Sequence, residues 1–364
     1  MPRPPEYSDL FTNRKRSVLP ENVQKLASEL GVLLRKKRRV SKELVSAFRS
    51  ALQNLPAQCV PRGAFEIRDI AQMNMGYAQR DPLGFGSSFL RTLRLRRENG
   101  DTLLREHPDL GWLLMFHGSG FVRQAAMEAL TSPPSCPFEV AAVVYRLNDW
   151  ISNVRTASKT YASKFLVTAS AEAISESAFF LLPQITQLSR WDNQTLSVVH
   201  DSIYRTEVLD EMKEQFLAPR SGKVGQTLRL VLQRADFDIH LEKLAFDAVL
   251  PTVRAIATET LLMGRARWIV GYRRKWVDKV YGLSRRVAEY ETRSVEIDFG
   301  MADFLGVAAR DKSPLVRSVA ADFLIKNREH LTFELAEVSD VLRNDESSAV
   351  RSRINFLDRT IANA

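Results

Sequence analysis

The stretch DKSPLVRSVAADFLIKN (311–327) is typical of one amphipathic helix with an arginine at the edge of its apolar face. Ser313 is a favourable N-cap, and Pro314 suits the first helical position because no free backbone donor is needed there. The residues that follow at helical spacing predict one buried face: Leu315, Val316, Val319, Ala320, Phe323 and Leu324. Arg317 borders this face, so its stem can pack there while its guanidinium reaches a partner.

The Val-Arg phrase, followed by small or apolar residues at helical spacing, recurs along the chain. Its arginines are Arg123, Arg155, Arg254, Arg317 and Arg351, the last in a copy whose apolar stripe is interrupted. Consecutive arginines are 32, 99, 63 and 34 residues apart, and the two long gaps are close to three and two times the short ones. A period of this length with one helical phrase per unit predicts an array of helix pairs.

The residues before the phrases predict the partner helices. PFEVAAVVYRL (137–147) forms an apolar helix that ends at Asn148, and DLGWLLMF (109–116) does the same before the turn HGSG (117–120). The pattern resembles the HEAT-repeat family, in which the second helix commonly reads Pro-x-Val-Arg-x-x-Ala. The best match is formed by Pro314, Val316, Arg317 and Ala320.

The resemblance covers about residues 107–364, although 165–245 lack the phrase. It implies an all-α fold, a solenoid of HEAT-like helical hairpins. It also implies that each arginine bonds an acidic side chain or carbonyl groups of a neighbouring repeat, with Asp149 and Asp311 as candidate partners.

Composition agrees with a helical, cytoplasmic protein. The chain has 364 residues, 45% of them hydrophobic, and 16 glycines, and it shows few of the alternating runs that predict strands. Two cysteines make no disulfide framework, the N-terminus resembles no signal peptide, and no apolar stretch is long enough to span a bilayer.

Positive charge is concentrated at the N-terminal end. Residues 1–106 contain 20 Lys and Arg against 11 Asp and Glu, whereas 107–364 contain 32 of each. We expect a mobile Pro-rich arm at 1–20, a basic helical segment at 21–106 and the repeat array at 107–364, with helices from about Glu21 and Ser41 and an irregular connection at 56–88. Such asymmetry is frequent in proteins that bind polyanions.

Two sets of basic residues are candidate polyanion-binding sites. The segment 264–286 combines cations with aromatic rings; its residues are Arg265, Arg267, Trp268, Tyr272, Arg273, Arg274, Lys275, Trp276, Arg285 and Arg286. On a continuous helix its rings at 268, 272 and 276 would align, although Gly271 weakens that expectation. The structural alternative is that the aromatic rings are packed in the core and the arginines form a solvated face.

The second set is RKKRR, which is Arg35, Lys36, Lys37, Arg38 and Arg39, together with RKR (14–16) and RTLRLRR (91–97). These residues create a positive field for an acidic protein, a nucleic acid or an anionic membrane, or they are simply a solvated surface.

No catalytic residues, cofactor or metal site is expected. DFDIH (236–240) would need a strand to bring Asp236, Asp238 and His240 together as metal ligands, and its helical flanks favour a helix-entry turn. Some alkylpurine DNA glycosylases resemble HEAT arrays and use tryptophans with a carboxylate. Residues of those types here are Asp149, Trp150, Trp268, Trp276 and Asp278, but their spacing does not match that family.

The sequence therefore favours a non-enzymatic scaffold or adaptor that binds an extended acidic macromolecule. A nucleic-acid-binding protein that uses the basic and aromatic patches is the alternative, and a HEAT-like glycosylase is a third possibility.

Overall fold

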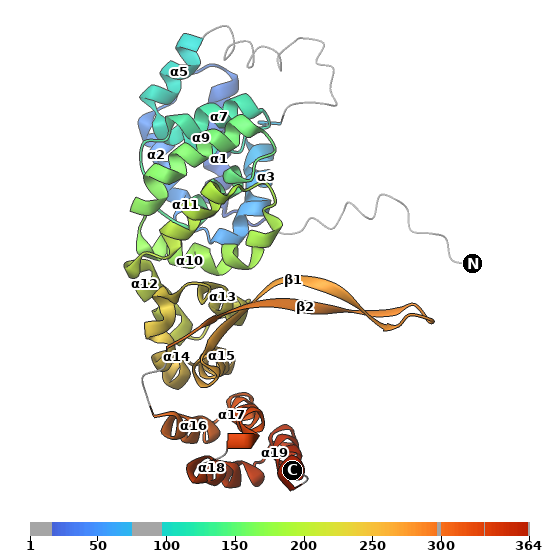
Figure 1. The fold of residues 1–364 in the computed structure, drawn as a ribbon. Helices are drawn as coiled ribbons and strands as arrows, with labels where there is room; N and C mark the ends of the chain where they lie inside the picture. Colours follow the sequence, from blue (N-terminus) through green and yellow to red (C-terminus); the bar gives the residue numbers. More distant parts are fainter. Residues whose placement is uncertain (1–16, 75–96, 297–299, 331, 363–364) are drawn as a thin grey trace, which may run out of the picture. The chain divides into compact units, whose positions relative to one another are not determined.

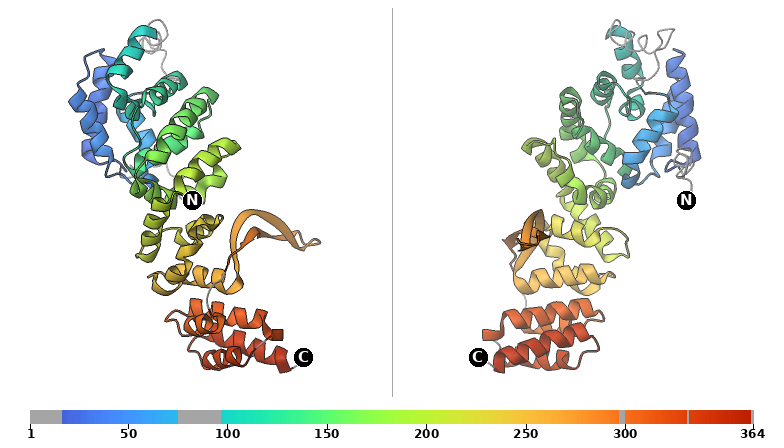
Figure 2. Two further views of the ribbon diagram at one scale, coloured as in Figure 1. Left: turned by 60° about the vertical axis from the view of Figure 1, so that its left-hand side comes forward. Right: turned by 90° about the vertical axis from the view of Figure 1, so that its right-hand side faces the viewer.

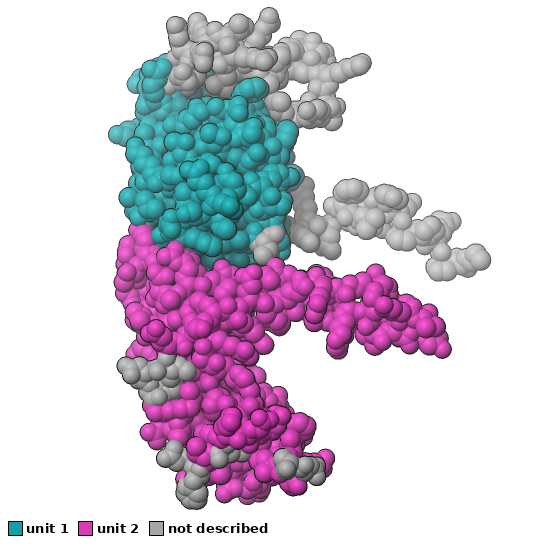
Figure 3. Space-filling model, viewed as in Figure 1, with its two compact units in different colours: residues 1–203 teal, residues 204–364 magenta. Residues whose placement is uncertain are grey.

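The computed structural model describes residues 17–74, 97–296, 300–330 and 332–362. By its internal contacts the chain divides into two compact units, residues 1–203 and 204–364 (Figure 3). In the described ranges the fold is mainly helical, with one two-stranded sheet (Figure 1). None of the helices in these ranges is long and apolar enough to cross a bilayer.

Unit 1 consists of helices joined by short turns. Its α-helices are α1 (Glu21–Arg35), α2 (Lys42–Leu52), α3 (Val60–Ile70), α5 (Arg97–Glu106), α6 (Gly111–Leu114), α7 (Gly120–Ala129), α8 (Pro137–Leu147), α9 (Ser152–Phe165), α10 (Ala171–Leu181) and α11 (Asn193–Ile203). Its 3-10 helices are η1 (Ala57–Cys59), η2 (Pro108–Leu110), η3 (Leu166–Thr168) and η4 (Leu182–Gln187).

Alternate helices of unit 1 pack on one another. Helix α9 lies between α7 and α11, and α8 packs on α10 (Figure 2). Helix α8 is buried at nearly every position, including Phe138 and Val143, so it forms the centre of the core. The N-terminal helices are joined to it by Arg49, whose guanidinium bonds the carboxylate of Glu139 at 3.1 Å.

Unit 2 contains the remaining helices and the sheet. Its helices are α12 (Thr206–Leu217), α13 (Val224–Val231), η5 (Ala235–His240), α14 (Leu241–Asp247), α15 (Pro251–Met263), α16 (Met301–Ala309), α17 (Pro314–Lys326), η6 (Arg328–His330), α18 (Phe333–Arg343) and α19 (Ser348–Ala362). The strands are β1 (Arg265–Asp278) and β2 (Leu283–Ser294). Helices α13, α15, α17 and α19 pack in that order, while α12 packs on α14 and α16 on α18.

The Val-Arg arginines share one hydrogen-bond pattern. In all five, Nη1 donates to the main-chain oxygen six residues earlier, which belongs to residues 117, 149, 248, 311 and 345. This bond ties the arginine to the turn that precedes its own helix. In α17 the guanidinium of Arg317 thus lies beside the turn that precedes the helix. The hydroxyl of Ser313 accepts the N-cap hydrogen bond from the amide of Leu315.

Three of these arginines also hold the aspartate of the next helix pair through two hydrogen bonds. The pairs are Arg123–Asp149 at 2.8 Å, Arg254–Asp311 at 2.8 and 2.9 Å, and Arg317–Asp345 at 2.5 and 2.9 Å. From the sequence, the carboxylates of Asp149 and Asp311 were expected to bond the arginines that follow them, Arg155 and Arg317. In the structure each carboxylate bonds the preceding arginine, and the main-chain oxygen bonds the following one.

The 63-residue gap between Arg254 and Arg317 does not consist of two spacings of the Val-Arg phrase. The Arg254–Asp311 pair joins α15 directly to the turn before α17, and the sheet of residues 265–294 is inserted between them. Removing these 30 residues from the 63 leaves 33, close to the 34 that separate Arg317 from Arg351. The inserted ribbon is nearly as long as the shorter spacings between the arginines, so the 63-residue gap resembles two of them in the sequence.

Several expectations from the sequence were wrong. Residues 264–286 are strand rather than helix, so the protein is not purely α-helical. The supposed irregular connection at 56–88 contains α3, because Pro61 stands in the first turn of that helix instead of interrupting one. The helix expected at 109–116 is shorter, with α6 preceded by η2. The mobile Pro-rich segment expected at 1–20 lies outside the described residues except for 17–20.

Candidate functional site

A two-stranded antiparallel ribbon, residues 265–294, projects from the helices of unit 2 (Figures 1 and 3). We call it the arm. At about 3.3 Å per residue, strand β1 is roughly 45 Å long. Its sequence contains the aromatic and β-branched residues that favour strands, including Trp268, Ile269 and Val270, and the strands are joined by a short turn that ends at Gly282.

The base of the arm is fixed to the helices. Ala266 and Trp268 are buried, the latter with 8% of its surface exposed. Arg293 donates to the main-chain oxygens of Leu232 and Arg234 at 2.8 Å, and it bonds both carboxylate oxygens of Asp238 at 2.5 and 2.7 Å. These contacts hold the root of the arm in one orientation.

A second ionic group supports the same root. Glu259 of α15 accepts from Arg229 at 2.6 Å and lies 3.3 Å from Arg267 of β1. Where the arm joins the helices, the main-chain amide of Val295 donates to the carbonyl oxygen of Gly264 at 3.0 Å. The two ends of the insertion therefore leave the helices side by side.

A β-bulge changes which side chains share a face. The strand pairing shifts between Ile269 and Gly271. A regular strand would place residues 268, 272 and 276 on one side, whereas the bulge puts Trp268 on the face opposite Tyr272 and Trp276. Trp268 is therefore a packing residue, while Tyr272 and Trp276 are 55% and 44% exposed.

Beyond the bulge, one face of the arm alternates guanidinium groups with aromatic rings. Arg286 lies over the ring of Tyr272 at 4.8 Å, and Arg274 lies over that of Trp276 at 4.6 Å. Nearer the base, Arg267 lies over Tyr290 at 4.5 Å. The register of the strands places all six of these side chains on the same side, which we call the ladder face.

The arm is strongly basic and pairs like charges. It contains nine Lys and Arg residues against three acidic residues. Arg274 lies directly opposite Arg286, and Lys275 opposite Arg285, at consecutive positions of the exposed part. Cations directly opposite each other destabilise a sheet. Within the part of the chain that the structure describes, these four side chains have no carboxylate partner in an ion pair.

The tip of the arm is apolar and ordered by hydrogen bonds. The carboxylate of Asp278 accepts from the main-chain amides of Val280 at 2.8 Å and Tyr281 at 3.1 Å. Gly282 follows with φ of 66°, a conformation that favours glycine. Val280 and Tyr281, at the end of this turn, are among the most exposed large hydrophobic side chains of the described residues.

The N-terminal basic residues belong to unit 1. Arg35 donates to the main-chain oxygen of Ala71 at 2.6 Å, whereas residues 36–39 are exposed just beyond the end of α1. The run RKR (14–16) and residues 91–96 of RTLRLRR lie outside the described residues. Of the predicted binding residues, the structure therefore brings together those of 265–286 in one arm.

The remaining candidates have hydrogen bonds within the fold. Asp238 bonds Arg293, and Asp236 bonds Arg234 at 3.1 Å, on the 3-10 helix η5. Among the described residues, no group of three or more His, Cys, Asp or Glu is placed to hold a metal ion.

Asp149, considered as a glycosylase carboxylate, is also engaged. It bonds Arg123 and, at 2.8 Å, Arg146. Burial alone would raise the pKa of Asp149. Hydrogen bonds from Arg123 and from the amide of Ile151 outweigh this effect, so the pKa of the carboxyl lies below its usual range. Neighbouring Trp150 is exposed, whereas Trp268, Trp276 and Asp278 belong to the arm in the other unit.

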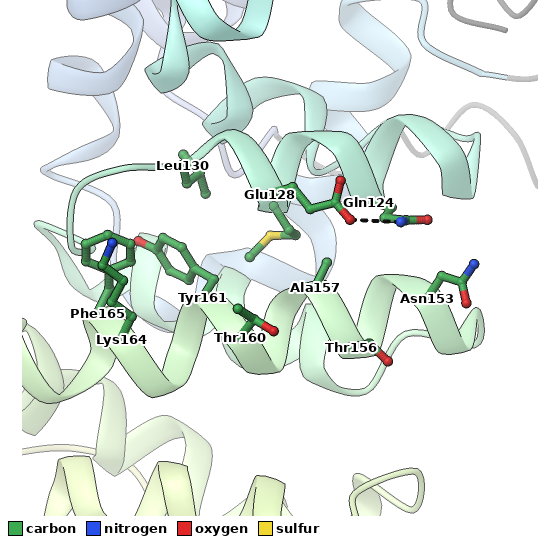
Figure 4. A pocket seen from close by; sticks show the side chains of 11 residues that line it. Gln124, Glu128, Leu130, Asn153, Thr156, Ala157, Thr160, Tyr161, Lys164 and Phe165 are labelled. Carbon is green, nitrogen blue, oxygen red and sulfur yellow. Dashed lines mark hydrogen bonds between the residues drawn. The ribbon is translucent and has the colours of Figure 1, made fainter. Parts of the chain in front are cut away.

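Unit 1 has a shallow cavity of about 470 Å³ between α7 and α9 (Figure 4). Its lining is mixed: Glu128 is bonded by Gln124 at 2.8 Å, and Lys164 lies over the ring of Phe165 at 4.9 Å. Tyr161 contributes its ring, but its hydroxyl donates to the main-chain oxygen of Ser132. Its two charged lining residues, one acidic and one basic, already have partners in the fold.

No protein-family model matches this chain, and the comparison with curated proteins also gave no match. The sequence analysis did not single out Val277, Lys279, Val280 or Tyr290, although the first three lie within the candidate segment 264–286. The signal was present, because DKVYGL (278–283) has turn residues between two segments rich in aromatic and β-branched side chains.

Proposed function

We propose that this protein binds nucleic acid through its arm, with a HEAT-like helical array as the frame. The packing of alternate helices inside each unit and the repeated arginine–aspartate pairs support the array. The arm supplies the recognition element, because it is the projecting, basic and aromatic part of the described chain.

The observation that carries the proposal is the pairing of like charges. Arg274 opposite Arg286 and Lys275 opposite Arg285 each weaken the ribbon by up to about 1 kcal/mol. A sequence selected only for folding would place an acidic residue in one strand of each pair. A row of phosphates along the arm removes the repulsion and gives each cation a counter-charge.

The shape of the arm suits a nucleic-acid groove. Two-stranded ribbons enter the major groove of B-form DNA, which is about 12 Å wide, and others enter the minor groove. The ladder face adds Tyr272 and Trp276, whose exposed rings can stack on bases or hold guanidinium groups in place for phosphates. An acidic protein is the alternative partner, since it would also neutralise the cations.

Fluorescence anisotropy with a labelled duplex tests the proposal. Five cations of the distal arm are available for phosphates, at positions 274, 275, 279, 285 and 286. The logarithm of the affinity should then fall with the logarithm of salt with a slope of about −4 to −5, so that affinity drops roughly 500-fold between about 50 and 200 mM.

The matched variants change three charges each. Lys275→Gln, Lys279→Gln and Arg285→Gln together should weaken binding by roughly 100-fold and reduce the slope by about 3. The control combines Lys243→Gln, Arg310→Gln and Lys312→Gln, which are exposed positions on helices or turns of the same unit. Equal losses in the two variants would contradict an arm-specific site. Binding of labelled polyglutamate, with no binding of the labelled duplex at low salt, would instead identify an acidic protein as the partner.

A further inference from the structure

The end of the arm exposes four apolar side chains. Val277, Val280, Tyr281 and Leu283 are 66%, 89%, 79% and 57% exposed. Tight turns usually consist of small or polar residues, and apolar surface in water is unfavourable. These four residues lie in or next to the turn that joins β1 and β2, and none of them belongs to the buried core. The turn is at the free end of the arm (Figure 1).

The apolar group is held ready by the turn. The two bonds from the amides of Val280 and Tyr281 to Asp278 fix the backbone that carries them, and Gly282 supplies the left-handed residue that returns the chain to β2. Because the backbone is already ordered, binding costs less conformational entropy than it would for a flexible loop. The arrangement resembles a preformed wedge.

Cations surround this wedge. Lys279 lies within the turn, while Lys275 and Arg285 are opposite each other in the adjoining strands. The fitting occupant therefore has apolar flat surfaces bordered by negative charges. A step between two base pairs has this chemistry, because stacked bases lie between two rows of phosphates.

We propose that the tip inserts Val280 and Tyr281 between adjacent base pairs of duplex DNA and bends the duplex at that step. This inference rests on the proposed function and adds to it the mode of binding. The cations of the arm hold the phosphates, and the wedge separates one pair of stacked bases. Inserted apolar side chains kink DNA by about 20–90°, at the cost of unstacking the step.

An anionic membrane would also attract an apolar tip with basic neighbours, but the charge distribution favours a polymer. Arg273, Arg274 and Arg286 lie on β1 and β2 behind the tip, on both faces of the ribbon. Screening limits the attraction of exposed charges to about 8–10 Å at physiological salt. A bilayer touched only by the tip would leave Arg274 and Arg286 without a counter-charge, whereas a duplex can follow the arm.

The experiment uses the full chain and a duplex that carries 2-aminopurine at central steps and a fluorescent dye pair at its ends. Binding should raise 2-aminopurine emission by unstacking and should increase energy transfer by bending. The variant with Val280→Ser and Tyr281→Ser should still bind, with its salt slope unchanged and its affinity reduced about tenfold, but it should lose both signals. The variant Phe65→Ser, at an exposed apolar position of unit 1, is the control and should behave as the unmodified protein.

The outcomes separate the two proposals. Salt-dependent duplex binding without unstacking or bending overturns the wedge and leaves nucleic-acid binding in place. Absence of duplex binding at low salt overturns both. If the tip variant binds and bends duplex normally but no longer binds phosphatidylserine vesicles, or no longer self-associates in sedimentation experiments, the tip serves a membrane or a second copy and the inference is wrong.

Discussion

The guanidinium of Arg293 and the carboxylate of Asp238 form a two-bond ion pair that joins strand β2 to the 3-10 helix η5. About a fifth of the surface of each side chain is exposed, so the pair is largely shielded from solvent. Arg293 further donates to the main-chain oxygens of Leu232 and Arg234. One residue at the base of the arm thus fastens it to the end of α13 and the turn that follows.

We expect Arg293→Ala to loosen the root of the arm. Loss of hydrogen bonds made by a charged group, with Asp238 left unpaired, should cost about 2–3 kcal/mol of the free energy of unfolding. Hydrogen exchange at residues 265–269 and 290–294 should accelerate, as measured by mass spectrometry. Arg265→Ala, at an exposed position of the same arm, provides the comparison and should leave these amides protected.

A second prediction is that one substitution in the arm raises the stability of the ribbon and lowers its affinity for duplex. Lys275→Glu replaces a cation opposite Arg285 by an anion, so it should stabilise the ribbon by about 0.5–1 kcal/mol. The same change should weaken duplex binding at least tenfold, because it removes one positive charge and adds a negative one. Hydrogen exchange of the arm and anisotropy measure the two effects. Lys243→Glu, on α14, should alter neither, and a parallel rise or fall of both quantities would contradict the argument.

A third prediction compares two arginines that occupy the same position in the Val-Arg phrase. Arg254 is 1% exposed and bonds both oxygens of Asp311, whereas the hydrogen bonds of Arg155 are made to the main-chain oxygens of Asp149 and Trp150. Arg254→Ala should therefore cost about 3–5 kcal/mol because Asp311 loses its partner. Arg155→Ala should cost about 1 kcal/mol. Urea unfolding followed by circular dichroism measures both.

Arg254→Lys tests whether charge alone is sufficient. An ammonium group cannot reproduce two parallel bonds to the carboxylate together with bonds to the oxygens of Ala248 and Val249. We expect this variant to recover less than half of the loss. Full recovery would mean that the geometry of the guanidinium is unimportant.

A fourth prediction follows from buried His117. Its Nδ1 accepts a hydrogen bond from the amide of Ser119 at 2.9 Å. Burial and the nearby guanidinium of Arg123 lower the pKa of His117 from about 6.5 to about 4. The unfolded chain therefore binds this proton more readily than the folded protein does. The stability that depends on neutral His117 is complete above about pH 6.5 and is lost as pH falls toward 4.

The expected size of this loss is about 2–3 kcal/mol between pH 7 and 4.5. His117→Asn keeps an acceptor for the amide of Ser119 without a titrating ring, so it should reduce the slope of unfolding free energy against pH. His330→Gln, at an exposed position, should leave the slope unchanged. If His117→Asn retains the full slope, other groups control the pH dependence.

Helix positions could be predicted from the sequence because their signals are local. Ser313 and Pro314 mark the start of α17, and the apolar spacing of residues 315–324 marks its buried face. Prolines were harder to interpret, because Pro61 looks like an interruption until it is seen in the first turn of α3. The residues next to a proline do not show whether it begins a helix or lies in the connection between two helices.

The arm could not be predicted because its spacing is ambiguous. Residues 268, 272 and 276 are four apart, which aligns them on a helix and also, without a bulge, on a strand. The shift at Gly271 that separates Trp268 from Tyr272 depends on pairing with a distant strand. The basic and aromatic residues of 264–286 were proposed as a candidate site from the sequence, whereas the exposed apolar side chains of the tip were not, because their exposure depends on the folded ribbon.

The direct bond between Arg254 and Asp311 also has a consequence for how this protein can diverge. Because the flanking helices are held together without the inserted ribbon, and because its two ends meet at Gly264 and Val295, the ribbon is an exchangeable part. Its reach, its charge and its end residues can vary in descendants while the frame keeps its buried contacts. Substitutions in the distal part of the ribbon therefore leave the Arg254–Asp311 pair intact.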